Sequence, residues 1–282
     1  MAERVTLIDG RPDDCLPVSD RGLQYGDGLF ETIAVRRGQS CLWGRHLARL
    51  AAGCERLGIP KPNPELLAAE RDDLLARAAA TDGVLKLTIT RGSGPRGYAP
   101  PAAPRPRRIL SFAAGLPTTT DRAEAGVRLT LCATRLGENA RLAGIKHLNR
   151  LEQVLARAEW SDPRTLDGLM CNAQGHVICG TMSNIYALDD AGIATPPLTR
   201  CGVAGTVRSV MQDCAQDLGI PFAERVLRPA DLFAARGLLI SNALLGVVPV
   251  ASLQAHGYST EALPTELIER VRQIALEPET HP

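Results

Sequence analysis

The 282-residue chain is poor in lysine and carries almost no net charge. Its lysines are Lys61, Lys86 and Lys146, and all of its other basic residues apart from histidine are arginine. The formal net charge of +1 gives no electrostatic drive toward nucleic acid or an anionic membrane surface. We therefore expect neither partner. Any reaction that needs a primary amine has only these three lysine side chains to draw on.

The sequence also lacks an export signal, a long unbroken apolar run and paired cysteines. The opening MAERVTLIDG has neither the basic nor the apolar segment of a signal peptide. The most apolar stretch, from Gly237, is interrupted by Ser, Asn and Pro, so we expect core strands and not a membrane span. The eight cysteines form no CxxC pair and no zinc-ligand spacing. We expect a cytoplasmic protein with reduced thiols and no metal site.

The apolar patterns predict a mixed α/β architecture. The length suggests two domains, which we place at residues 1–117 and 118–282, joined by a polar linker at 116–126. The first domain should contain a strand at 5–10, a hairpin at 29–43, helices at 44–58 and 64–80, and strands at 83–92 and 108–115. The second should contain a strand at 127–136, a helix at 148–160, strands at 165–172, 176–180, 183–190 and 192–197, and a helix at 206–218.

Lys146 is the strongest candidate for chemistry that needs an amine. It stands in LAGIKHLNRLEQ between the apolar Ile145 and Leu148, where a loop leads into a helix, so we expect it to be partly buried. Burial lowers the pKa of a lysine and favours the neutral, nucleophilic amine. Lys61 reads as a surface loop residue. Lys86 alternates with leucines on a strand and faces either solvent or a cavity.

Several other segments could bind anions. GVAGTVRSV at 202–210 places glycines before a helix, which suits either an anion cradle or a plain loop–helix junction, and the turn in SNALLGVVPV at 241–250 is similar. Arg49, beside the apolar face of its helix, could reach a buried phosphate or face solvent. Arg96 and Tyr98 lie in a Gly/Pro-rich loop and form a candidate carboxylate clamp.

The order of the motifs resembles the class IV aminotransferases, the fold-type IV enzymes that use pyridoxal 5′-phosphate (PLP) and include branched-chain and D-amino-acid aminotransferases. Over roughly residues 5–255 the chain carries YGDGLFETI, HLARL, RGSGPRGY, GIKHLNRLEQ, SNIY, GVAGTVR and NALLGVVPV in that order. Within this family, RGSGPRGY, AGIKHLNRLEQ and NALLGVVPV are most similar to bacterial 4-amino-4-deoxychorismate lyases. The resemblance implies a smaller N-terminal two-layer α/β domain and a larger, barrel-like C-terminal α/β domain. It also implies a homodimer whose active site is shared between subunits.

The resemblance also implies how these residues would hold PLP and a small-molecule substrate. Lys146 would bind the cofactor covalently, and Arg49 would bind its phosphate. Arg96 and Tyr98 would hold a substrate carboxylate. Phe30 stands where a D-amino-acid aminotransferase would have Tyr, which argues against that activity. The phosphate would also meet the backbone of two short segments, Thr206–Val207 and Asn242–Ala243.

One position departs from the family pattern. The family has a Glu five residues before the Asn of the SN motif, where it keeps the pyridine nitrogen protonated. Counting back from Asn184 gives Cys179, whose thiol is a weak hydrogen-bond donor. A weaker electron sink favours elimination over transamination or reduces catalysis, unless another group takes this role or the local alignment shifts.

The resemblance therefore implies a PLP-dependent lyase that converts 4-amino-4-deoxychorismate to 4-aminobenzoate and pyruvate, a reaction of folate biosynthesis. Two alternatives remain. One is a D-amino-acid or branched-chain amino-acid transaminase, and the other is a PLP-binding protein with weak or lost catalysis.

Overall fold

The computed structural model of the protein describes residues 4–117, 125–261 and 263–278. The chain divides into two compact units. The first comprises Met1–Leu116 with two short later segments, Ile145–Asn149 and Leu276–Pro282. The second comprises Pro117–Gly144 and Arg150–Ala275. Most of the linker expected at 116–126 lies outside the described residues, so the proposed boundary at 117/118 stays a prediction.

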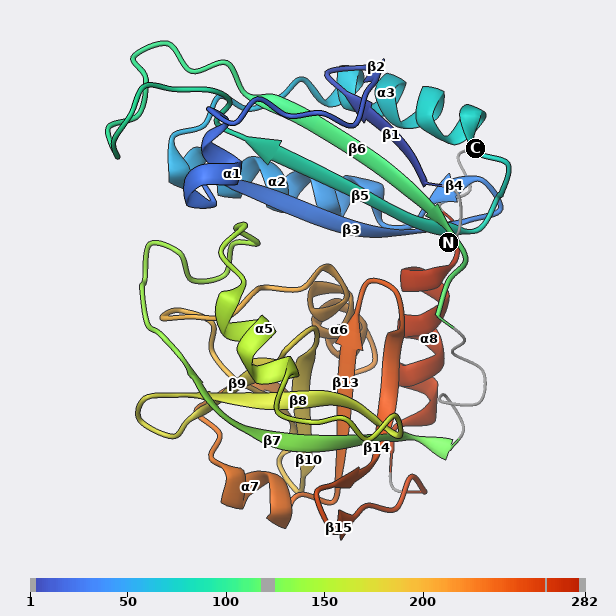
Figure 1. The fold of residues 1–282 in the computed structure, drawn as a ribbon. Helices are drawn as coiled ribbons and strands as arrows, with labels where there is room; N and C mark the ends of the chain where they lie inside the picture. The colour runs from blue at the N-terminus through green and yellow to red at the C-terminus, as the bar shows by residue number, and fades with distance from the viewer. Residues whose placement is uncertain (1–3, 118–124, 262, 279–282) are drawn as a thin grey trace. The chain divides into compact units, whose positions relative to one another are not determined.

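Unit 1 is built on a six-stranded antiparallel sheet with the strand order β2-β1-β6-β5-β3-β4. Two helices, α2 and α3, cover one face of this sheet (Figure 1). Alternate residues of β3, such as Leu29 and Ile33, are buried. The elements of unit 1 are β1 (Arg4–Ile8), β2 (Arg11–Pro12), α1 (Arg21–Tyr25), β3 (Gly28–Arg36), β4 (Gln39–Ser40), α2 (Trp43–Leu57), α3 (Pro64–Arg77), β5 (Gly83–Thr90) and β6 (Arg107–Ala114).

The helices of unit 1 begin and end where their sequences supply caps. The side chain of Asn63 accepts hydrogen bonds from the first backbone N–H groups of α3, and Pro64 opens that helix. Gly58 ends α2 in the left-handed conformation, with φ of 63°. The five-residue helix α1 was not among the elements predicted from the sequence. Asp20 caps its first turn, and Gly26 ends it with φ of 64°.

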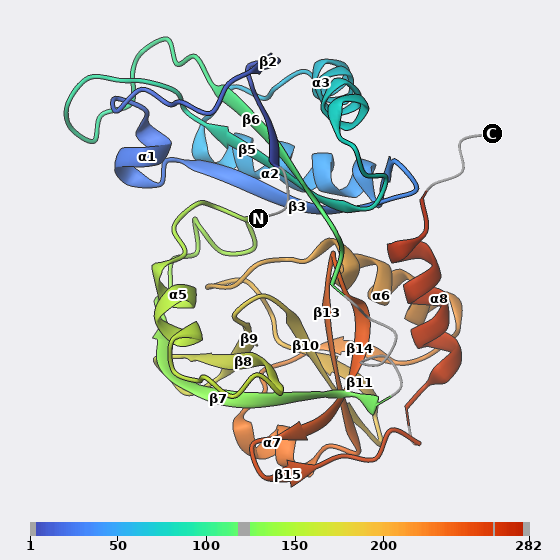
Figure 2. The same ribbon diagram turned by 45° about the vertical axis from the view of Figure 1, so that its right-hand side comes forward.

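Unit 2 is built on a nine-stranded mixed sheet that curls around an apolar cluster (Figure 2). Eight strands follow the order β12-β11-β10-β13-β14-β7-β8-β9, and β15 pairs with β14. The elements of unit 2 are β7 (Val127–Leu136), α5 (Leu151–Arg157), β8 (Thr165–Asn172), β9 (Val177–Gly180), β10 (Asn184–Asp189), β11 (Gly192–Thr195), α6 (Thr206–Asp217), β12 (Phe222–Glu224), α7 (Pro229–Ala234), β13 (Gly237–Asn242), β14 (Gly246–Leu253), β15 (His256–Gly257) and α8 (Thr265–Leu276).

The expected mixed α/β fold is confirmed, with curled sheets and helices in both units. Within the described residues, no helix has both the length and the apolar character needed to cross a membrane.

Candidate active site

Lys146 is attached to the free edge of β3. On this edge β4 pairs only with Val35 and Arg36, so the N-terminal half of β3 remains open. The short segment 145–149 occupies it. The backbone N–H of Phe30 donates to the carbonyl of Lys146 at 3.0 Å, and the N–H of Leu148 donates to the carbonyl of Gly28 at 3.0 Å. The lysine therefore belongs to unit 1, although it lies far along the chain from β3.

The side chain of Phe30 lies beneath two ammonium groups. The Nζ atom of Lys146 lies 4.3 Å from the centre of the Phe30 ring, and the Nζ atom of Lys86 lies 5.3 Å from it. Lys86 pairs in register with Thr32, two residues after Phe30, so both lysines lie close to Phe30. An aromatic face attracts each cation, whereas the two like charges repel each other. The arrangement favours an anionic ligand between or beside them.

Arg49 is held by a buried carboxylate. Glu31 of β3 accepts a hydrogen bond from the Arg49 Nε atom at 2.8 Å and a second from Nη2. The same carboxylate lies 2.6 Å from Nδ1 of His46, which precedes Arg49 by one turn of α2. Such a bidentate contact fixes the plane of the guanidinium. The structure thus brings Lys146, Phe30 and Arg49 together in unit 1 around Glu31 and His46.

The charges in this cluster follow from its contacts. Burial alone would raise the pKa of Glu31, but hydrogen bonds from His46 and Arg49 outweigh it and lower the pKa. The carboxylate is therefore ionised at neutral pH and balances Arg49. Burial is the largest cause that lowers the pKa of His46, and the positive charges of Arg49 and Lys146 add to it. His46 is therefore neutral at pH 7, because its ordinary value is already below that pH.

Arg96 and Tyr98 lie on the exposed loop between β5 and β6. Both side chains are exposed, and Tyr98 retains 85% of its accessible surface. Its ring contacts that of Tyr25 at a centroid distance of 5.5 Å. The guanidinium of Arg96 forms no ion pair within the part of the chain that the structure describes. Both groups are available to a ligand from outside unit 1.

In unit 2 the turn before α6 is a candidate anion cradle. Gly205 caps the helix without a side-chain hydrogen bond, so the first N–H groups of α6, including those of Thr206 and Val207, have no partner within the helix. Thr206 is only 4% exposed, yet its Oγ1 atom has no hydrogen-bond partner among the described residues. Buried hydroxyl groups normally have partners. A phosphate oxygen at the positive end of the helix would supply one.

Asn184 fixes the shape of this cradle. Its Oδ1 atom accepts from the backbone N–H of Gly205 at 3.2 Å, and its Nδ2 atom donates to the carbonyl of Val203 at 3.0 Å. A Cβ atom on Gly205 would lie 2.2 Å from that Oδ1 atom. Only glycine allows the turn to approach Asn184 this closely.

The second predicted backbone segment, Asn242–Ala243, stands at the end of β13. Asn242 Oδ1 accepts from the N–H groups of Leu244 and Leu245, both at 2.9 Å, and shapes the tight turn into β14. Because α6 packs against β13, both predicted phosphate-binding segments belong to one part of unit 2. Their contacts with a phosphate stay a prediction.

Cys179 lies on β9 within an apolar cluster that includes Met170 and Cys201. Burial is the largest cause that raises the pKa of its thiol, to about 12, and the nearby charge of Asp167 adds to the rise. The thiol is therefore neutral at physiological pH. It cannot supply the negative charge that would keep a pyridine nitrogen protonated, whatever else it contacts.

The residues present fit a phosphate-bearing aldehyde cofactor such as PLP. Within unit 1, Lys146 offers a half-buried amine beside an oriented arginine. Taken by itself, unit 2 offers a helix N-terminus with an orphaned hydroxyl, which suits a phosphate.

Three residues that shape the candidate site were not predicted from the sequence: Glu31, His46 and Asn184. The pattern of β3 held a signal for the first, because Glu31 alternates with Leu29 and Ile33 and so had to fall on the buried face. A charge there implies a buried partner. The motif SN was noted, but nothing local in the sequence indicates that Asn184 reaches a turn some twenty residues later.

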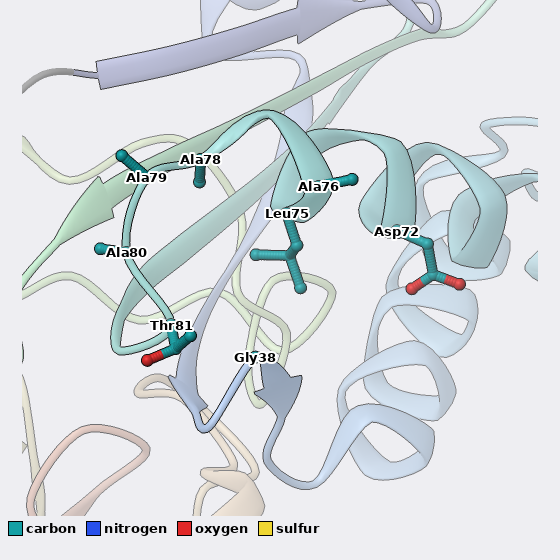
Figure 3. A pocket seen from close by; sticks show the side chains of 8 residues that line it. All are labelled: Gly38, Asp72, Leu75, Ala76, Ala78, Ala79, Ala80 and Thr81. Atoms are coloured by element: carbon teal, nitrogen blue, oxygen red, sulfur yellow. The ribbon is translucent and has the colours of Figure 1, made fainter.

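A separate cavity of about 340 Å³ lies at the far end of unit 1, beside the β3–β4 turn (Figure 3). It offers one carboxylate and no cationic side chain, so it does not suit a phosphate. It is lined by Gly38, Asp72, Leu75, Ala76, Ala78, Ala79, Ala80 and Thr81.

Comparison with known proteins identifies the relatives of this chain. The family model of amino-transferase class IV matches residues 28–253. The chain is 36% identical to an aminodeoxychorismate lyase of Vibrio harveyi over 88% of this chain and 91% of that protein. It resembles the crystal structure of a 4-amino-4-deoxychorismate lyase from Pseudomonas aeruginosa with a TM-score of 0.88 and 48% identity, covering 95% and 98% of the two chains.

A more distant structure shares the fold alone. The PLP-bound form of a hypothetical aminotransferase from Mycobacterium tuberculosis superposes with a TM-score of 0.80 at 20% identity, covering 96% of this chain and 99% of that one. The family expected from the motif order is thus confirmed. Its enzymes use PLP, and this chain belongs to the class IV aminotransferase family.

Proposed function

We propose that the protein is a PLP-dependent lyase that converts 4-amino-4-deoxychorismate to 4-aminobenzoate and pyruvate. The observation that carries this proposal is the similarity to two lyases of that name, which spans nearly the whole chain and not only the family motifs. The amine on Lys146 and the anion cradle of α6 are the groups that such a reaction needs. As an enzyme of folate biosynthesis, it would act on a small molecule in the cytoplasm.

We assign the cofactor ligands from the family resemblance. Lys146 would bind it covalently, Arg49 would bind its phosphate, and the N–H groups of Thr206 and Val207 with the Thr206 hydroxyl would complete the phosphate site. When bound, PLP withdraws electrons from the carbon that carries the substrate's amine. Glu31 orients Arg49 and offsets its charge before the phosphate arrives.

The Nζ atom of Lys146 is the proposed proton carrier. With the cofactor and substrate bound, the Lys146 amine would take the proton from the amine-bearing ring carbon. The bond between the ring and the enolpyruvyl oxygen then breaks, and the same amine is placed to return a proton to the departing group. The Phe30 ring lies below Nζ, and the backbone bond between Phe30 and Lys146 fixes the main chain that carries this amine.

The substrate carries two carboxylates, because each of its two products carries one. Arg96 and Tyr98 would bind one of them, as the family resemblance implies. We propose Lys86 for the other, since its ammonium lies beside Phe30 and forms no ion pair within the described residues.

We also propose a homodimer whose subunits share their active sites. The supporting observation is the apolar face of α5, on which Leu151, Val154 and Leu155 are 77%, 61% and 62% exposed. These residues follow the i, i+3, i+4 spacing of a single helix face. Three neighbouring aliphatic side chains exposed on one helix are typical of an interaction surface.

The decisive experiment compares substrates on the PLP-loaded enzyme. We expect equal amounts of pyruvate and 4-aminobenzoate from 4-amino-4-deoxychorismate, and little conversion of D-alanine or branched-chain amino acids. Conversion of an amino acid with formation of the pyridoxamine spectrum would support a transaminase instead. PLP binding without pyruvate release would support a binding protein with lost catalysis. Reduction of the loaded enzyme with borohydride should leave the cofactor mass on the peptide that contains Lys146.

A further inference from the structure

The loop that carries Arg96 and Tyr98 is folded around a buried arginine of a different element. Arg21 opens α1 and is only 4% exposed. Its stem passes the loop so closely that a Cβ atom on Gly94 would lie 2.9 Å from Cδ of Arg21 and 3.6 Å from the ring of Pro101. The loop therefore encloses this side chain.

The guanidinium of Arg21 binds three consecutive carbonyl groups of the loop. Nη1 donates to the carbonyl of Gly97 at 3.0 Å and to that of Ala99 at 3.3 Å, and Nη2 donates to the carbonyl of Tyr98 at 3.0 Å. These carbonyls immediately follow Arg96. The bonds fix the backbone that carries both proposed substrate-binding side chains, although Arg21 touches neither of their polar ends.

Further contacts keep Arg21 itself in place. Asp27 accepts from Nε of Arg21 at 2.8 Å and also from Nε of Arg91 at 2.8 Å. Arg91 in turn donates to the carbonyls of Leu57 and Gly58 at the end of α2. The loop is thus connected through two arginines and one carboxylate to the helix layer of unit 1.

Tyr25 adds a second, weaker attachment. Its hydroxyl accepts from the N–H of Gly97 at 3.3 Å, its ring contacts the ring of Tyr98, and the Arg21 guanidinium lies 4.9 Å from the centre of its ring. Both attachments start from α1, the short helix that the sequence did not predict.

We propose that Arg21 is a positioning residue that sets substrate affinity by holding the Arg96–Tyr98 loop in its binding conformation. The proposal rests on the function proposed above, which makes this loop a carboxylate site. Lysine cannot replace Arg21, because three carbonyls and one carboxylate require several donors in a planar arrangement. Arg21 should affect the binding of the substrate and not the chemical step.

The test uses the PLP-loaded Arg21→Lys enzyme with two measurements. The first is the rate at which trypsin cuts after the exposed Arg96, which reports opening of the loop. The second is the KM and kcat of pyruvate release. Losing two or more hydrogen bonds should raise both the cleavage rate and KM at least about tenfold. The kcat and the affinity for PLP should stay within about twofold of the wild type.

The matched control is Arg108→Lys. Arg108 is also a largely buried arginine of unit 1 and is bound to the carboxylate of Glu70, with Nε at 3.0 Å from both oxygens, but it does not touch the loop. It should leave cleavage after Arg96 and KM unchanged. Tyr25→Phe removes only the bond from Gly97 and should raise both quantities about threefold, which keeps the test open if Arg21→Lys does not fold.

Three outcomes would overturn the proposal. Unchanged cleavage in both Arg21→Lys and Tyr25→Phe would show that these residues do not hold the loop. Faster cleavage with an unchanged KM would show that the loop does not position the substrate. A KM raised equally in Arg108→Lys and in Arg21→Lys would show that losing any buried arginine of unit 1 disturbs substrate binding. If the wild type releases no pyruvate, the proposed function fails, and the substrate role of Arg21 fails with it. The rate of cleavage after Arg96 would still show whether Arg21 holds the loop.

Discussion

The anion cradle makes a sharp prediction at Gly205. Changing Gly205 to Ala adds a single methyl group whose carbon would lie 2.2 Å from Oδ1 of Asn184. The backbone itself would tolerate alanine, since φ is −67° and ψ is 146°. The substitution therefore acts only through this clash, so either the Asn184 side chain or the turn at Gly205 must move.

The expected magnitude follows from what the movement breaks. The hydrogen bond from the Gly205 N–H to Asn184, at 3.2 Å, would be lost, and the N–H groups of Thr206 and Val207 would turn away from the phosphate. A neutral hydrogen bond contributes about 1 kcal/mol, and one to a charged group contributes about 1.5–3 kcal/mol. We expect the affinity for PLP to fall about tenfold to a hundredfold.

The assay is the equilibrium dissociation constant of PLP, measured by absorbance on reconstituted enzyme. The control is Gly44→Ala on α2, where an added Cβ meets nothing within 4 Å. That variant should bind PLP as the wild type does and gain about 0.5–1 kcal/mol of stability from its better helix propensity. Wild-type PLP affinity in Gly205→Ala would refute the assignment of this turn as the phosphate site.

Other expected outcomes concern the substrate, the dimer and pH. Lys86→Met should raise the KM for the two-carboxylate substrate about tenfold with little change in kcat. The control Lys61→Met should leave KM unchanged. Equal KM values in the two variants would contradict the role of Lys86. Leu155→Glu should convert a dimer to a monomer by light scattering, and an unchanged mass would remove α5 from the interface. Asp27→Asn should lower Tm at pH 7 and reduce the free energy of unfolding by about 3 kcal/mol. Burial would raise the pKa of Asp27, but hydrogen bonds from two arginines lower it. The stability that Asp27 contributes is therefore present above its unfolded pKa, about 3.9, and is lost as pH falls through its lower folded value, so the Tm difference should shrink below about pH 4. A difference that stays constant between pH 7 and pH 3 would contradict this.

The sequence predicted most of the architecture because the relevant signals are local. Apolar alternation located β3 and β5. The helical spacing of Leu50, Cys54 and Leu57 located α2, and Gly58 indicated its end. The helix α1 was missed because five residues are too few for a periodic pattern to show. Its caps, Asp20 and Gly26, read equally well as parts of a loop.

The candidate site was predictable only in part, because several of its contacts join distant segments. The motifs indicated Lys146 and Arg49, but no local pattern shows that residues 145–149 complete the edge of β3. Likewise, Arg21 reaches carbonyls 76–78 residues later in the chain. Such pairings depend on the fold as a whole, and a single sequence carries no record of them.

The most direct test of the account is pyruvate release from 4-amino-4-deoxychorismate by the wild-type enzyme and by Lys146→Ala, both supplied with PLP. We predict equimolar pyruvate and 4-aminobenzoate from the wild type. In the variant, the rate of pyruvate release should fall by about a hundredfold to ten-thousandfold, the range expected when a positioned proton-transfer group is removed. A variant that keeps the wild-type rate, or a loaded wild type that releases no pyruvate, would contradict the account.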